Sequence, residues 1–114
     1  LTLKTLKTFK FHLADFISLD LELTGISPKG NSILDTTEIR YNKYRQTAEK
    51  FKIISVGITT FIKNSETDFT CKPYNFYVFP EENSGNPQIN WELGAIIFNR
   101  DHQMDFNKWI NKGI

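Results

Sequence analysis

The chain has 114 residues, of which 39% are hydrophobic, 14% aromatic and 24% charged, and its formal net charge is +1. This balance excludes a disordered chain, and the small net charge excludes recruitment of nucleic acid by a global field. Cys71 is the single cysteine, so no intrachain disulfide forms, and no apolar run approaches the roughly 20 residues of a membrane span. We therefore expect a globular domain without membrane contact. We place it inside the cell, in the nucleus or cytoplasm, with an organelle left open.

The first elements in chain order are an ambiguous segment and a clear strand. Residues 1–14 carry leucines at helical spacing but also the alternating stretch FKFHL, and a helix is favoured. Residues 16–23 alternate at period 2, so the branched apolar side chains share one face and the polar ones the other. The apolar set is Ile17, Leu19, Leu21 and Leu23, and the polar set is Ser18, Asp20 and Glu22. A loop rich in Gly, Ser and Pro follows.

The later elements are a charged helix, a hairpin and two short helices. Asp35 followed by Glu38 predicts a helix start with Asp35 as the N-cap, and the helix should run to about residue 49. Residues 51–62 and 69–80 predict two strands of a hairpin, with Pro73 at a bulge or on an edge. Residues 91–99 and 105–111 predict helices, the second capped by Asp105. This order predicts one α/β unit around a mixed sheet with flanking helices.

Asp20 and Glu22 stand out because two like charges on one face of an apolar strand repel each other. Three explanations remain open from the residues alone. The face is simply solvated, or each carboxylate has a basic partner, or the two share a hard cation such as Mg²⁺ or Mn²⁺. The pair lies at the strand end beside Gly25, where ligands of α/β sheets commonly bind, and this position favours the metal.

A family resemblance extends this interpretation. The segment around the acids resembles the first exonuclease motif of the DEDD ribonucleases, in particular poly(A)-specific ribonuclease and the related enzymes that trim small-RNA 3′ ends. Four further blocks are similar to that family and occur in its order. The five blocks are residues 20–26 (DLELTGI), 34–41 (LDTTEIRY), 56–61 (VGITTF), 75–80 (NFYVFP), and 105–108 (DFNK) with 113–114 (GI).

The resemblance implies a ribonuclease-H-like fold and two-metal 3′-to-5′ removal of nucleotides from RNA. It implies that Asp20 bridges both metals and that Glu22 holds the metal that activates water. It also implies a lining for the terminal nucleotide, formed by Leu23, Thr24, Gly25 and Ile26. Phe98 falls where the family has an aromatic residue near a base, and a core position beside Ile96 and Ile97 is the alternative.

The chain departs from the family pattern in two places and matches only part of it. Val56 stands where the family often has Gln, and residues 91–94 (WELG) replace a Ser-rich stretch. Only two of the four family acids are matched, and His12 and His102 are expected at the surface or in capping positions. We therefore interpret residues 1–114 as the N-terminal part of a longer exoribonuclease domain, inactive alone, with an unpaired sheet edge and an uncovered apolar face.

Two functions follow from these observations. The first is a Mg²⁺- or Mn²⁺-dependent, deadenylase-like 3′-to-5′ exoribonuclease acting on poly(A) or other single-stranded RNA ends. The second is an inactive nuclease-derived domain that binds RNA or packs in a ribonucleoprotein assembly. A homodimer is left open. Several lysines, including Lys50 and Lys52, form either a basic flank for phosphates or ordinary solvated faces.

Overall fold

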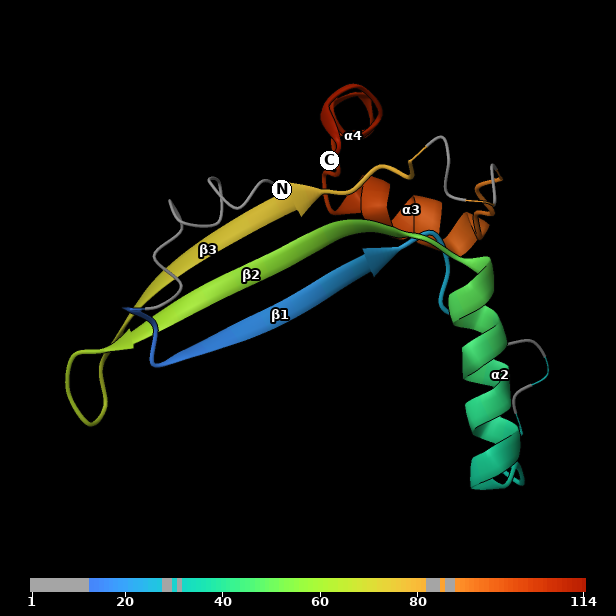
Figure 1. The fold of residues 1–114 in the computed structure, drawn as a ribbon, viewed down its shortest axis with the longest axis horizontal. Helices are drawn as coiled ribbons and strands as arrows, with labels where there is room; N and C mark the ends of the chain where they lie inside the picture. The colour runs from blue at the N-terminus through green and yellow to red at the C-terminus, as the bar shows by residue number, and fades with distance from the viewer. Residues whose placement is uncertain (1–12, 28–29, 31, 82–84, 86–87) are drawn as a thin grey trace.

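The computed structural model describes residues 13–27, 30, 32–81, 85 and 88–114. The helix predicted over residues 1–14 and the position of His12 therefore lie almost entirely outside the described residues. Figure 1 shows a three-stranded sheet with three helices gathered toward one end of it. None of the helices in the described ranges is long and apolar enough to cross a membrane.

The sheet consists of β1 (Phe16–Leu23), β2 (Ile53–Lys63) and β3 (Phe69–Tyr77) in the order β1-β2-β3. Both pairings are antiparallel, and β2 and β3 form the predicted hairpin. Pro73 lies opposite Thr59 in an unbroken register on the edge strand β3, where a missing N–H costs no ladder bond. The edge position predicted for Pro73 is therefore confirmed, and the bulge is not found there. The one register shift between β1 and β2 falls at Glu22 and Leu23.

Helix α2 (Thr37–Lys50) extends away from the sheet and buries no residue (Figure 1). The prediction of its N-cap was wrong by one residue. Thr36 is the cap, because its hydroxyl accepts a hydrogen bond from the amide of Ile39. The Asp35 carboxylate accepts instead from the amide of Ser32 and lies 2.6 Å from the Lys43 ammonium. These two contacts lower the pKa of Asp35, the hydrogen bond from Lys43 being the largest cause.

Helices α3 (Leu93–Asp101) and α4 (Phe106–Lys112) confirm the two predicted short helices. Asp105 caps α4 by accepting from the amide of Lys108, as predicted. Trp109 is buried and donates its indole N–H to the carbonyl of Val78 at 2.7 Å, which fixes α4 just beyond the end of β3. The aromatic rings of Phe79 and Trp91 complete this small cluster.

The core is small for a chain of this size. Among the residues that the structure describes, the buried apolar side chains are Phe51, Ile54 and Trp109. The surface area is 9007 Å² for 13.3 kDa, against about 6,500 Å² for a folded monomer of that mass. On the sheet face opposite the acids, Leu19 is 62% exposed and Ile17 55%. The uncovered apolar face expected from the sequence is therefore present.

Candidate functional site

Asp20 and Glu22 project from one face of β1 near its end, as the alternation predicted. Across the ladder they lie opposite Gly57 and Ser55 of β2, two small residues that leave the space above the acids open. A Cβ atom at Gly57 would lie 3.6 Å from the Cβ of Asp20, which is ordinary contact distance. The acids thus line a hollow of about 460 Å³ that extends across β2 to Pro73 and Asn75 of β3.

The electrostatics of the pair show that the two carboxylates are crowded. Partial burial raises the pKa of Glu22, the negative charge of Asp20 raises it further, and His102 offsets part of the rise. None of the ion pairs among the described residues involves either acid. A basic partner therefore does not explain the pair within the described chain. A divalent cation would relieve the repulsion, since carboxylate oxygens are the ligands that Mg²⁺ and Mn²⁺ prefer.

A second hollow of about 550 Å³ adjoins the acids and is more apolar. It brings together Asp20 and Glu22 with three of the residues predicted to contact RNA: Leu23, Ile26 and Phe98. Phe98 is 48% exposed and stacks on the His102 ring with 4.0 Å between centroids, so it is not a core residue. We refer to this hollow, between the end of β1 and helix α3, as the acidic pocket.

Thr24 and Gly25 lie behind the acidic pocket instead of lining it. Thr24 is fully buried, and its hydroxyl accepts from the amide of Lys52 at 3.0 Å. A Cβ atom at Gly25 would lie 2.6 Å from the Phe51 ring and 2.8 Å from the side chain of Glu92. The glycine is therefore required by packing within the chain. Direct contact of either residue with RNA stays a prediction.

Glu92 is the residue that the sequence did not single out for the site. Its carboxylate accepts from the amides of Ile26 at 3.2 Å and Ser27 at 3.4 Å, and its own amide donates to the carbonyl of Thr24. One side chain thereby ties the loop after β1 to the start of α3. The pattern WELG at residues 91–94 was the available signal, but a contact over 66 residues cannot be found from local sequence.

A third, polar hollow of about 150 Å³ lies on the other side of Glu22. His102 lines it together with Ser55 and Asn75, whose side chains are hydrogen-bonded to each other. His102 is also the C-cap of α3, and its Nδ1 lies 2.8 Å from the carbonyl oxygen of Phe98. The capping position expected for His102 is confirmed. Its proximity to Glu22 was not predicted.

Val56, the other departure from the family pattern, is paired with Leu21 and therefore shares the apolar face of the sheet. Its side chain points away from the acids. Any effect of this residue on a bound ligand would have to pass through the sheet.

The acids alone do not complete a metal centre. Within residues 13–27, 30, 32–81, 85 and 88–114, no group of three His, Cys, Asp or Glu side chains could hold a metal ion. The described residues thus place two carboxylates side by side and add no third metal-ligating side chain to them.

Comparison with known proteins identifies the family to which this fold and acid pair belong. The model of the CAF1 family ribonucleases matches residues 3–114. The chain therefore belongs to the CAF1 ribonuclease family, and the predicted relationship to poly(A)-specific ribonucleases is confirmed.

Individual relatives support this assignment. The chain is 36% identical over 109 residues to poly(A)-specific ribonuclease PARN of Arabidopsis thaliana, covering 89% of this chain and 16% of that protein. It is 34% identical over 104 residues to the pre-piRNA 3′-exonuclease trimmer of Bombyx mori, covering 87% of this chain and 20% of that protein. The chain thus spans about a fifth or less of the length of these relatives.

The fold has a counterpart among solved structures. The Mg²⁺- and Mn²⁺-bound form of Pop2p from S. pombe superposes with a TM-score of 0.66 at 18% sequence identity. The match covers 97% of this chain and 44% of that one. The predicted ribonuclease-H-like α/β fold with flanking helices is confirmed. The sheet was predicted to be mixed, and the three strands that the structure describes pair only antiparallel.

Proposed function

We propose that this chain provides the first acidic motif of a divalent-metal-dependent 3′-to-5′ exoribonuclease that shortens poly(A) or other RNA 3′ ends. The observation that carries the proposal is the placement of Asp20 and Glu22 together on the wall of the acidic pocket, beside Leu23, Ile26 and Phe98. Family membership supports ribonuclease chemistry, and two relatives are named for 3′-end or poly(A) substrates.

In this proposal Asp20 and Glu22 hold the metal ions through their carboxylate oxygens. Two divalent ions at such a site activate a water molecule and stabilise the leaving oxygen of a phosphodiester. A cation at the site would favour the ionised form of Glu22 and so oppose the rise in its pKa caused by burial and by Asp20. The remaining ligands and a general base would come from sequence outside this chain. On that interpretation residues 1–114 are the N-terminal part of the catalytic domain.

The chain's apolar residues would orient the RNA end. Leu23 and Ile26 offer aliphatic surface to the terminal nucleoside, and Phe98 offers a half-exposed ring on which a base can stack. Glu92 and Thr24 would act as positioning residues that hold the loop carrying Ile26. This arrangement orders one wall of the pocket before RNA arrives.

The alternative is an inactive nuclease-derived domain that binds RNA or packs in a ribonucleoprotein assembly. It is favoured by the absence of a third metal ligand within the described residues. An intracellular location in the nucleus, cytoplasm or an organelle belongs to either proposal.

The test is the substitution Asp20→Ala in the protein at its natural length, assayed on a 5′-labelled oligoadenylate with Mg²⁺. We expect cleavage to fall by a factor of at least about 10³, because one ligand shared by the metals is lost, while RNA binding in EDTA changes little. Ser18→Ala, on the same face of β1, is the control. Cleavage by the Asp20 variant at the rate of the unmodified protein would disprove the metal role. A parent protein that binds RNA without cleaving it would favour the alternative.

A further inference from the structure

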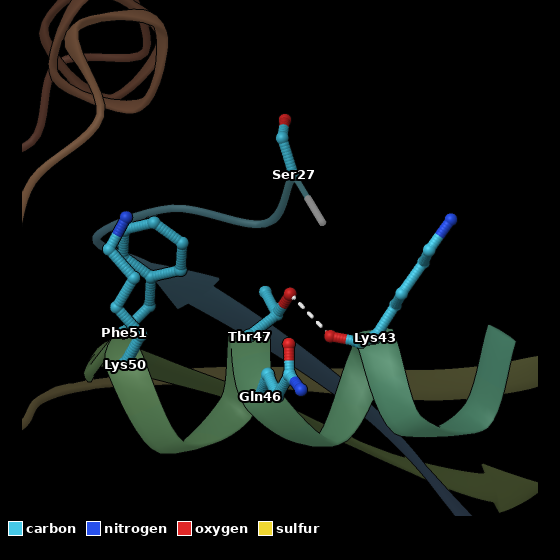
Figure 2. Close-up of a pocket in the computed structure, with 6 residues that line it drawn as sticks. All are labelled: Ser27, Lys43, Gln46, Thr47, Lys50 and Phe51. Atoms are coloured by element: carbon cyan, nitrogen blue, oxygen red, sulfur yellow. Dashed lines mark hydrogen bonds between the residues drawn. The ribbon is translucent and has the colours of Figure 1, made fainter. Parts of the chain in front are cut away.

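A hollow of about 210 Å³ lies between the loop after β1 and one face of α2 (Figure 2). Four side chains of the helix line it at the spacing i, i+3, i+4 and i+7, which places them on a single face. They project from the side of α2 that faces the loop carrying Ser27, and Phe51 closes one end (Figure 2). We call this hollow the α2 groove; it is lined by Ser27, Lys43, Gln46, Thr47, Lys50 and Phe51.

The polar groups that line the α2 groove suit an anion. No carboxylate lines it among the described residues. The charge of Lys43 is already matched by Asp35 at 2.6 Å, and the hydroxyl of Thr47 donates to the carbonyl of Lys43. Lys50 takes part in no ion pair within the described chain, and its ammonium lies 4.5 Å from the centre of the Phe51 ring. Figure 2 shows the Ser27 hydroxyl on the side of the loop away from α2, so the donors that remain for a ligand are Lys50 and Gln46.

The neighbouring acid does not cancel the charge of Lys50. Glu49 lies one residue away, but its carboxylate is 3.0 Å from the Nε of Arg45, on a different face of α2. At the closed end of the groove the Lys50 ammonium rests on the buried Phe51 ring and is in no ion pair among the described residues. A phosphate group would find one cation, Lys50, and one neutral donor, the Gln46 amide, there.

The α2 groove and the acidic pocket share one wall. Ser27 lines both hollows, and its amide is held by the Glu92 carboxylate. A polymer whose end lies against Asp20 and Glu22 can therefore continue over Ser27 into the α2 groove without leaving the surface. The acidic pocket has apolar side chains beside its acids, which suits a nucleoside, and the α2 groove has a lysine, which suits a backbone phosphate.

We propose that the α2 groove binds a backbone phosphate of the RNA upstream of its 3′-terminal nucleotide, with Lys50 as the charged contact. The inference deepens the proposed function and rests on it. Lys50 holds the strand by charge, Gln46 donates a hydrogen bond, and the groove reads no base. The consequence is a dependence of affinity on RNA length.

The experiment measures binding of fluorescent diadenylate and decaadenylate by anisotropy, in EDTA, for the protein at its natural length and for Lys50→Met. Met keeps the unbranched stem over Phe51 and a high helix propensity. Lys112→Met is the matched control, because Lys112 also lies in the last turn of a helix but on α4.

We expect Lys50→Met to weaken decaadenylate binding about threefold to fivefold and to reduce the slope of log affinity against log salt by roughly 0.7, the value for one phosphate contact on a single strand. Diadenylate binding and the Lys112 variant should be unchanged. Lys50→Arg should restore the affinity. Gln46→Ala removes a neutral hydrogen-bond donor, and we expect it to weaken decaadenylate binding less than Lys50→Met does.

Three results would overturn the inference. An affinity for decaadenylate that Lys50→Met leaves unchanged would exclude the α2 groove as a phosphate-binding site. The proposed function would still stand if Asp20→Ala abolished cleavage. Equal losses for both oligonucleotides would place Lys50 at the terminal nucleotide. If the unmodified protein at its natural length bound neither oligonucleotide, both the inference and the proposed function would be wrong.

Discussion

At the scale of single residues, the electrostatics of Glu22 give a direct test of the crowded acid pair. Asp20→Asn removes a negative charge and keeps the shape of the side chain. We expect the pKa of Glu22 to fall toward 4.5 and to remain above it, because burial still raises it. Titration of the Glu22 carboxyl carbon by NMR in EDTA measures this, with Ser18→Ala as the uncharged control. An unchanged pKa would show that the two carboxylates do not interact.

The same shift has a consequence for stability. A carboxyl whose pKa is raised in the folded state binds more protons there than in the unfolded chain. Glu22 therefore favours the folded state at low pH, and this contribution is lost as the pH rises through the window just above 4.5. Asp20→Asn should make the stability lost between low and neutral pH smaller. Urea titrations at pH 4 and pH 7 would detect this as a smaller difference in the free energy of unfolding.

At the scale of elements, the junction after β1 is held by packing against Gly25. The ring of Phe51 and the side chain of Glu92 would both lie within 3 Å of a new Cβ atom there. We expect Gly25→Ala to lower the free energy of unfolding by about 1–3 kcal/mol, as overpacking does elsewhere. Gly94→Ala is the matched control, because its Cβ atom would meet nothing within 4 Å. Urea denaturation measures the free energy of unfolding of both variants. A Gly25→Ala variant as stable as the unmodified protein would show that the junction has room to adjust.

The elements themselves were largely predictable, with instructive exceptions. The alternation of β1 and the β-branched run of β2 identified the strands, because side-chain periodicity is a local property. The cap of α2 was misassigned because Asp35 and Thr36 are both good cap residues. The ion pair with Lys43, eight residues away, engages Asp35 and leaves the cap to Thr36.

At the scale of the whole molecule, the exposed apolar face of the sheet dominates. Leu19 and Ile17 are more than half exposed, and β1 has a free edge among the described strands. We expect the 114-residue chain to bind the dye anilinonaphthalene sulfonate and to self-associate. Leu19→Lys should reduce dye fluorescence at least about twofold, whereas Ser18→Lys on the opposite face should not. Equal fluorescence of all three proteins would mean that the face is covered in solution.

The sequence by itself determined the order of strands and helices, the shared face of Asp20 and Glu22, and the family resemblance. These depend on periodicity and on residue identity along the chain. Only the tertiary structure decided how distant segments meet. It placed Glu92 against the loop at Ile26, set His102 beside Glu22, turned Val56 away from the acids, and opened the α2 groove beside Ser27. Each depends on contacts between residues far apart in the sequence, and packing and charge in three dimensions settle those contacts.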